Sequence, residues 1–249
     1  MSSAQVNPLE QNLANTVQVN DRALNGFIKA PSLPVRLICE AIGTCCFVVF
    51  GAGCATKSGS GLLAISTAHG IVTVWLVYVF GSISGAHFNA AATIAFTINR
   101  QMKIVDALLY IIAQALGALL AGALLLLLYY GNDTNLGTPE LALLPYPVTV
   151  LQGFCLEFLC TVILSFVIFF TTSYNTHKEA ALPVGLVVFS SFLLASDRDG
   201  AALNPWRWLG PAVASNTYSS YAWIYIVGPI SGFIVGLIFF RIYKLIWNL

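Results

Sequence analysis

Two short stretches of this sequence decide its fold: residues 84–91, which read SGAHFNAA, and residues 200–207, which read GAALNPWR. In each stretch small residues precede an asparagine, and a short apolar segment begins there, residues 89–98 in the first and 204–213 in the second. Asparagine favours the N-cap of a helix, and the proline of the second stretch suits the first helical position. Neither segment can cross a bilayer, because crossing takes about 20 apolar residues. Each stretch therefore predicts a half-helix that enters a membrane without spanning it.

The rest of the chain has the composition of a membrane protein. Of its 249 residues, 58% are hydrophobic and only 8% are charged, whereas a soluble domain carries about 25% charged residues. The mean hydropathy is +0.82, which excludes both a soluble globule and a disordered chain. Eleven Lys and Arg residues against ten Asp and Glu leave a net charge of +1 and no basic block, so no nucleic-acid partner is expected. We expect an integral membrane protein in contact with the lipid bilayer.

The reactive side chains form no catalytic or metal-binding pattern. The six cysteines lie in or beside apolar runs, and none has the spacing of a metal-binding pair, so they are expected to be buried apolar residues. No nucleophile–base pair is visible in the sequence. We therefore expect no enzyme activity, no metal and no cofactor.

Six longer apolar stretches are candidates for membrane-spanning helices. They cover residues 35–53, 64–83, 105–130, 148–172, 181–195 and 221–243. The polar first 33 residues lack the apolar core of a cleavable signal peptide, so the first span is expected to direct insertion. Together with the two half-helices, these stretches predict an all-α membrane protein.

The two halves of the chain repeat one pattern. Glu40 precedes Asn89 by 49 residues in the first half, and Glu157 precedes Asn204 by 47 residues in the second. Each half holds three spans, an odd number, so the two copies must have opposite orientations in the membrane. Paired short segments in inverted repeats point to a transport path at the midplane of the membrane.

The basic residues predict which side each loop faces, because cytoplasmic loops carry the excess of Lys and Arg. Eight basic residues lie on the side of the N-terminus: Arg22, Lys29, Arg36, Arg100, Lys103, Lys178, Arg241 and Lys244. Lys57 and Arg198 lie on the opposite side, and Arg207 falls in the second half-helix. Both termini are therefore expected in the cytosol. The chain is expected to begin with a cytosolic arm at 1–34 and to end with a cytosolic tail at 244–249. Between them lie two repeats, 35–130 and 148–243. An extracellular loop at 131–147 joins the repeats and holds an N-glycosylation sequon at Asn132.

Glu40 and Glu157 lie inside predicted spans, where an ionisable side chain is costly and needs polar partners. One interpretation makes them a proton relay. The other makes them structural acids that hydrogen-bond the non-helical backbone of the re-entrant segments, which lipid cannot satisfy. Their matching positions in the two halves favour the structural role.

The re-entrant segments are expected to line the path. Small residues let an extended backbone approach the path and present its carbonyl groups; the candidates are Gly85, Ala86, His87, Gly200 and Ala202. Asn89 and Asn204 can each cap a half-helix while the amide NH2 faces the lumen. Two half-helices that enter from opposite sides bring two positive dipole ends together, which repels cations and interrupts a proton wire.

On these motifs the chain resembles the aquaporins of the major intrinsic protein family, from about residue 35 to residue 243. The two Asn-Pro-Ala motifs of that family correspond here to Asn89-Ala90-Ala91 and Asn204-Pro205-Trp206. The flanking SGAHFN and NPxRxxGP patterns are also typical of the family. The resemblance implies an hourglass of six tilted helices and two half-helices, assembled as a homotetramer with one pore in each subunit.

The resemblance also implies an aromatic/arginine selectivity filter at His69, Phe192, Ala201 and Arg207. A water channel of the family typically carries histidine where this chain has Phe192, so the filter is not the standard one. Trp208 follows the filter arginine, where glycerol facilitators usually carry aspartate, and this favours water. The expected function is a passive water channel, and the alternative is a broader pore for glycerol, ammonia or hydrogen peroxide.

The motifs also allow other interpretations. Ala90 replaces a proline of the family motif, and Trp206 replaces a small alanine, so Trp206 either narrows the pore or packs behind it, near small residues such as Ala41 or Gly43. A channel gated by the arm or by the 171–180 loop with its His177, a scaffold without transport, and a secondary transporter are further alternatives. The host membrane is expected to be the plasma membrane or the vacuolar membrane.

Overall fold

The structure is a computed structural model that describes residues 31–56, 61–129, 135–143 and 147–247. Contacts divide the chain into two units, Met1–Ser32 and Leu33–Leu249, and the fold is that of the second unit. Most of the predicted N-terminal arm, Lys57 and the sequon at Asn132 lie outside the described residues.

The described part of the chain is helical and contains no strand. Its helices are α2 (Leu33–Ala55), α3 (Gly61–Ser84), α4 (Ala90–Ile98), α5 (Ile104–Tyr129), α6 (Val150–Tyr174), α7 (His177–Ala195), α8 (Pro205–Ser215) and α9 (Ile224–Trp247). Six of them are long and apolar enough to span a membrane, and α4 and α8 are the two short ones. The expectation of an all-α membrane protein with six spans and two half-helices is confirmed.

The long helices carry large apolar side chains on their outer faces, which suits a bundle in lipid. Large hydrophobic side chains stay exposed on the outer face of the bundle; on α5, Leu116 is 61% exposed and Leu127 is 75% exposed. In water such a surface would promote aggregation, whereas lipid tails match it. The exposed leucines therefore fit an outer face that meets an apolar environment rather than water.

The helices approach one another closely where glycines replace side chains. A Cβ atom on Gly117 of α5 would collide with the carbonyl oxygen of Ala41 on α2. In the second half, a Cβ atom on Gly232 of α9 would collide in the same way with the carbonyl oxygen of Phe158 on α6. Small residues at helix crossings are the usual way in which membrane helices pack, because lipid supplies no hydrophobic drive between them.

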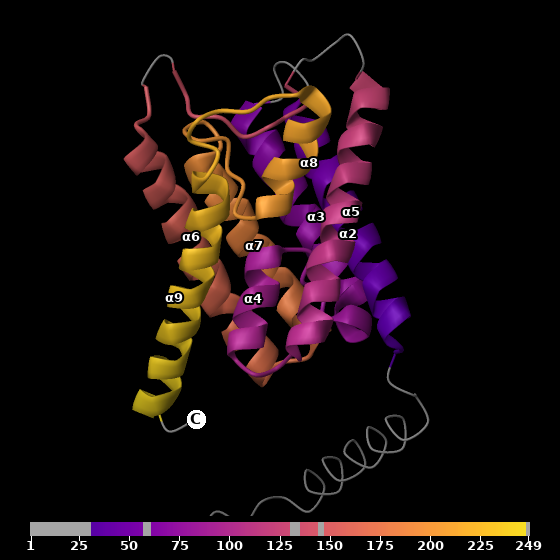
Figure 1. The fold of residues 1–249 in the computed structure, drawn as a ribbon. Coiled ribbons are helices and arrows are strands. Elements are labelled where there is room, and N and C mark those ends of the chain that lie inside the picture. The colour runs from indigo at the N-terminus through magenta and orange to yellow at the C-terminus, as the bar shows by residue number, and fades with distance from the viewer. Residues whose placement is uncertain (1–30, 57–60, 130–134, 144–146, 248–249) are drawn as a thin grey trace, which may run out of the picture. The chain divides into compact units, whose positions relative to one another are not determined.

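The two half-helices lie end to end between the long helices (Figure 1). Each packs against the third span of the other half, α4 against α9 and α8 against α5. The two halves also make matching bonds: the hydroxyl of Tyr110 donates to the carbonyl of Ser84, and that of Tyr225 donates to the carbonyl of Asp199. The two halves that share a sequence pattern therefore also share their helix packing and the corresponding tyrosine hydrogen bonds.

The segment 171–180 is not the long loop that the sequence suggested. Helix α6 continues to Tyr174, and α7 begins at His177 and not at residue 181. The reason is a capping box, in which the Thr176 hydroxyl accepts from the backbone N–H of Glu179 while the Glu179 carboxylate accepts from Thr176. The connection is therefore too short to fold over the bundle.

The crossing of α5 and α8 supplies a test of the fold. A Cβ atom on Gly122 would collide with the carbonyl oxygen of Gly210, so Gly122→Val should push the two helices apart. Overpacking of this kind costs about 1–3 kcal/mol, and we expect a lower melting temperature in detergent. Ala123→Val is the matched control, because Ala123 is the next residue on α5 and is exposed. Equal melting temperatures for the two variants would contradict this packing.

Candidate functional site

Asn89 and Asn204 are the N-caps of the two half-helices. Both residues have extended backbone, with φ of −151° at Asn89 and −159° at Asn204. The side-chain oxygen of Asn89 accepts from the backbone N–H of Ala91 at 2.9 Å, and that of Asn204 accepts from the backbone N–H of Trp206 at 3.0 Å. Each cap satisfies one of the backbone donors that a helix start leaves free.

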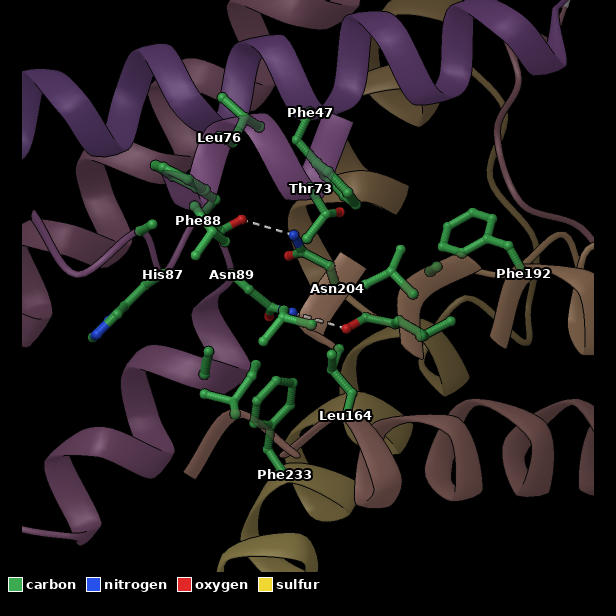
Figure 2. Close-up of a pocket in the computed structure, with 18 residues that line it drawn as sticks. Phe47, Thr73, Leu76, His87, Phe88, Asn89, Leu164, Phe192, Asn204 and Phe233 are labelled. Atoms are coloured by element: carbon green, nitrogen blue, oxygen red, sulfur yellow. Dashed lines mark hydrogen bonds between the residues drawn. The ribbon is translucent and has the colours of Figure 1, made fainter. Parts of the chain in front are cut away.

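The two asparagine amides also bond across the centre of the molecule. Nδ2 of Asn89 donates to the carbonyl oxygen of Leu203 at 2.9 Å, and Nδ2 of Asn204 donates to the carbonyl oxygen of Phe88 at 2.8 Å. Figure 2 shows these two bonds side by side between the two segments. They join the start of α4 to the start of α8, so two segments more than 110 positions apart meet at one point.

The segments before the asparagines have a strained backbone. Ala86 and Phe88 have φ of +52° and +46°, and Ala201 and Leu203 repeat the pattern with +45° and +56°. A left-handed backbone costs a residue with a side chain about 1–2 kcal/mol. Such a conformation persists only where the surroundings impose it, and in this protein two buried glutamates do so.

Glu40 binds the first segment. One carboxylate oxygen accepts from the hydroxyl of Ser84 at 2.6 Å and from the backbone N–H of His87 at 3.0 Å. The other accepts from the backbone N–H of Phe88 at 2.7 Å and from the side-chain amide of Gln114 at 2.8 Å. With four donors around a fully buried carboxylate, the arrangement favours a structural acid over a proton relay.

Glu157 binds the second segment in the same way. Its two oxygens accept from the backbone N–H groups of Ala202 at 2.6 Å and Leu203 at 2.7 Å. The side chain is also fully buried. Both glutamates therefore supply acceptors to backbone amides that have no helical partner.

Trp206 packs behind the central cavity and does not narrow it. Its indole N–H donates to the side-chain oxygen of Gln114 at 3.1 Å, and the residue is absent from the lining of the central cavity. The space beside Gly43, suggested as room for the indole, is taken by the ring of Phe88. Trp206 thus stands where the family motif has a small alanine, and its side chain makes a hydrogen bond to α5.

This bond closes a ring that runs through both halves of the chain. Asn204 donates to Phe88, whose backbone N–H donates to Glu40; Gln114 donates to Glu40 and accepts from Trp206, whose backbone N–H donates to Asn204. The side chain of Gln114 also donates to the Thr93 hydroxyl on α4 at 3.0 Å. One buried amide on α5 therefore links both half-helices.

A central cavity of about 60 Å³ surrounds the two asparagines (Figure 2). It is lined by Phe47, Thr73, Leu76, Val77, Ala86, His87, Phe88, Asn89, Ala92, Leu164, Ile168, Val184, Val188, Phe192, Ala202, Leu203, Asn204 and Phe233. A water molecule needs roughly 10–15 Å³ of such volume, so the cavity has room for a short file of waters. Most of its wall is apolar, and polar groups gather at the asparagines.

Five residues are predicted to present backbone carbonyl groups to the path, and most of them line a cavity. Ala86, His87 and Ala202 line the central cavity, and Gly85 lines a smaller neighbouring cavity of about 30 Å³. Gly200 lines neither, because it lies against the backbone of residues 139 and 140. Four of the five predicted residues therefore border open space.

Several residues of the cavity wall are not among those predicted from the sequence. Thr73 lies one helical turn after His69 on α3, and Val188 lies one turn before Phe192 on α7. The spacing of four residues along a helix is the signal that could have found both. Phe47 on α2 and Leu164 on α6 each lie seven residues, about two helical turns, after the buried glutamate of the same helix, so the same kind of spacing could have found them.

Two of the four predicted filter residues, His69 and Phe192, touch each other. The rings of His69 and Phe192 stack with centroids 3.7 Å apart, and Phe47 meets His69 edge-on at 5.7 Å. Gly51 leaves room for the imidazole, since a Cβ atom there would collide with it. Nδ1 of His69 bonds the carbonyl of Ile65 at 2.9 Å, and Nε2 has no partner among the described residues.

Arg207 and Ala201 complete the predicted set. Arg207 is buried, and its Nη1 donates to the carbonyl of Gly137 at 2.6 Å, while its Nε has no partner in the described part of the chain. Ala201 is fully buried and donates its backbone N–H to Oδ1 of Asp199 at 2.9 Å. Of the four residues, only Phe192 lines the central cavity itself.

No cluster of potential metal ligands occurs in the described ranges. All six cysteines are described, and all are free thiols. The expectation that they are buried holds for Cys39, Cys45 and Cys160 and is wrong for Cys155, which is exposed, while Cys46 and Cys54 are half-buried. The structure thus offers a cavity with polar groups at its centre, and it offers no metal centre among these residues.

Comparison with known proteins identifies this arrangement. The profile of the family described as "Major intrinsic protein" matches residues 28–240. The chain belongs to the major intrinsic protein family. Members of the family are membrane channels for water or small solutes and not enzymes, so this protein is an integral membrane channel.

Two relatives and one solved structure illustrate the range of similar major intrinsic proteins. Nodulin-26 of Glycine max is 36% identical over 236 residues, covering 91% of this chain and 82% of the relative. The glycerol uptake facilitator protein-like 6 of Lactiplantibacillus plantarum is 34% identical over 205 residues, covering 80% and 94%. The aquaglyceroporin from Plasmodium falciparum has a similar fold, with a TM-score of 0.74 at 22% identity over 86% of this chain and 96% of that one.

The bond between Trp206 and Gln114 can be tested in this channel. Trp206→Phe keeps the ring but leaves the side-chain oxygen of fully buried Gln114 without its donor. An unsatisfied buried acceptor costs about 1–3 kcal/mol, so the melting temperature in detergent should fall. Trp223→Phe is the control, because Trp223 is 46% exposed. A Trp206→Phe variant as stable as that control would contradict the closed ring.

Proposed function

We propose that this channel conducts water passively and excludes ions and protons. The observation that carries the proposal is the pair of crossed bonds made by Asn89 and Asn204 at the centre of the cavity. Each amide has two N–H groups, and one of them donates to the opposite segment. The second can donate to the oxygen of a passing water.

This geometry dictates how a water file is oriented. A water that accepts from the asparagines has both of its hydrogens directed away from the centre, one towards each end of the path. The chain of hydrogen bonds along which a proton could hop is then interrupted. The positive dipole ends of α4 and α8 meet at the same point and repel cations.

We propose His69, Phe192, Ala201 and Arg207 as the selectivity filter. Two observations support this role: Nε2 of His69 and Nε of Arg207 are buried polar atoms without a partner among the described residues. Buried polar groups normally have hydrogen-bond partners, and a permeating water can serve as one. The fixed charge of Arg207 adds repulsion of cations.

We also propose that both termini lie in the cytosol and that the channel is a homotetramer with one pore in each subunit. The orientation follows from the distribution of Lys and Arg along the chain. Arg241 is one of these residues, and it bonds the carbonyl of Ile98 at the end of α4. The first half-helix therefore ends on the side assigned to the cytosol. The repeats at 35–130 and 148–243 are the two halves of each pore.

The deciding experiment is stopped-flow light scattering on proteoliposomes. An impermeant osmolyte should cause shrinkage much faster than in empty liposomes, and a glycerol gradient should cause no re-swelling. Water flux equal to that of empty liposomes would contradict the proposal. It would favour a closed channel or a scaffold.

A tryptophan in the cavity wall should block the flux. Val188 lines the cavity on α7, so Val188→Trp should lower water permeability by at least about tenfold, because it fills a path one water wide. Leu186→Trp is the matched control, since Leu186 is on the same helix and is 54% exposed. Both variants are checked for folding by gel filtration. Equal permeabilities would place the path elsewhere.

A second candidate is a pore for small neutral solutes such as glycerol. The favouring observation is the 34% identity to a glycerol uptake facilitator protein-like sequence, together with the small side chain of Ala201 in the proposed filter. The stacked rings of His69 and Phe192 argue for the narrower pore. The glycerol arm of the stopped-flow experiment separates the two candidates.

The width of the filter is tested by Phe192→Ala. Removal of the ring should raise glycerol permeability several-fold, since Phe192 fills the end of the cavity next to His69. Leu194→Ala, at a 54% exposed position on the same helix, is the control and should not change it. An unchanged glycerol permeability in a folded Phe192→Ala channel would exclude Phe192 as the narrowing residue.

A further inference from the structure

Among the positions at which the two halves of the channel differ, one carries Ser84 in the first half and Asp199 in the second. Each residue lies five positions before its asparagine. Each backbone carbonyl accepts a tyrosine hydroxyl from the third span of its own half, Tyr110 at 2.9 Å and Tyr225 at 2.7 Å. The two residues therefore occupy equivalent sites in the repeat.

In the first half, Ser84 joins the segment to the buried glutamate. Its hydroxyl donates to a carboxylate oxygen of Glu40 at 2.6 Å and accepts from the backbone N–H of Ala86 at 3.2 Å. One side chain thus acts as both donor and acceptor. The hydroxyl can do so because it carries a proton.

In the second half, Asp199 makes only one of these two bonds. Its Oδ1 accepts from the backbone N–H of Ala201 at 2.9 Å, which matches the bond from Ala86 to Ser84. Its Oδ2 is buried and has no donor within the part of the chain that the structure describes. Glu157 is the carboxylate that corresponds to Glu40, and among the described residues it accepts from the backbone N–H groups of Ala202 and Leu203. The bond that is missing in this half is the one from Asp199 to Glu157.

The charges around Asp199 favour a neutral side chain. Glu157 on α6 is a second buried acid that interacts with it electrostatically, and Asp197 in the same loop adds negative charge. Arg207 on α8 supplies one positive charge that interacts with Glu157, and Tyr225 on α9 donates to the carbonyl of Asp199. One arginine can balance one carboxylate, and a second buried carboxylate beside it would be unpaired.

Burial also raises the pKa of the Asp199 carboxyl, because desolvation penalises its charged form. The folded protein then binds a proton that the unfolded chain releases. Its contribution to stability is present at low pH and is lost as the pH rises through the pKa of the folded state.

We infer that Asp199 carries a proton at neutral pH and that its Oδ2–H donates to Glu157, as the Ser84 hydroxyl donates to Glu40. Asp199 is then a positioning residue, since its other oxygen holds Ala201 of the proposed filter. Loss of the proton leaves two adjacent carboxylates that repel each other and displace the segment 199–203. The conductance of the filter therefore depends on pH. The test by water permeability rests on the proposed function, whereas the proton on Asp199 can be observed by spectroscopy without any water flux.

Infrared spectroscopy tests the proton directly. The wild-type channel at neutral pH should show the carbonyl stretch of a protonated carboxyl that is absent from Asp199→Asn and that disappears from the wild type as the pH rises. Asparagine is the matched variant, because its oxygen can accept from Ala201 and its NH2 can donate to Glu157. Asp199→Ser places the side chain of the first half, that of Ser84, at the corresponding position. It replaces Asp199→Asn in the comparison if Asp199→Asn does not fold. A wild-type spectrum without such a band at neutral pH overturns the inference.

Water flux between about pH 5 and pH 9, equal on both sides of the vesicle, tests the consequence. As the pH rises, the water permeability of the wild type should fall to about half of its low-pH value at the midpoint of the Asp199 titration, where half of the channels have lost the proton. Asp199→Asn and Asp199→Ser should give flat profiles. A wild-type profile as flat as theirs overturns the role of Asp199 in the filter. If no variant conducts water at any pH, the proposed function fails, and the infrared band alone decides the inference.

Discussion

The whole structure depends on two buried carboxylates that bind backbone amides inside a membrane. The segments before the half-helices leave helical geometry, and hydrocarbon offers their N–H groups no acceptor, at a cost of several kcal/mol each. Glu40 and Glu157 supply these acceptors from neighbouring spans. With them in place, Phe88 and Leu203 can keep a left-handed backbone and bring the two asparagines together. A glutamate in a span, usually a sign of ion chemistry, is here a substitute for missing secondary structure.

The two halves solve this problem with different side chains. The first half uses neutral donors, the Ser84 hydroxyl and the Gln114 amide, around its glutamate. In the second half Asp199 stands where serine would be expected from the repeat, and Trp206 stands where the family motif has alanine. Trp206 is compensated, because its indole reaches Gln114. The repeat is therefore symmetric in its backbone and asymmetric in its side-chain chemistry.

The sequence predicts the spans, the half-helices and the capping asparagines well, because apolar length and helix caps are local signals. It does not predict where Trp206 points, since its partner Gln114 lies 92 positions away. The wall of the cavity is predictable only in part. Thr73 and Val188 lie one helical turn from predicted filter residues, but composition alone does not show that apolar residues such as Leu76 face inward. The short connection at Thr176 was a local signal that could have been read from its capping box. The features that cannot be predicted from the sequence are thus mostly side-chain contacts between residues far apart in the chain.

The crossed asparagine bonds have a consequence for biosynthesis. Asn89 needs the carbonyl of Leu203, and the carbonyl of Phe88 needs the amide of Asn204. When the ribosome has delivered only the first three spans, neither partner exists, and the first half-helix has open hydrogen-bonding groups at its inner end. Insertion of the first half cannot be followed at once by its final folding. The nascent first half must wait, near water or near the insertion machinery, until the second half is inserted beside it.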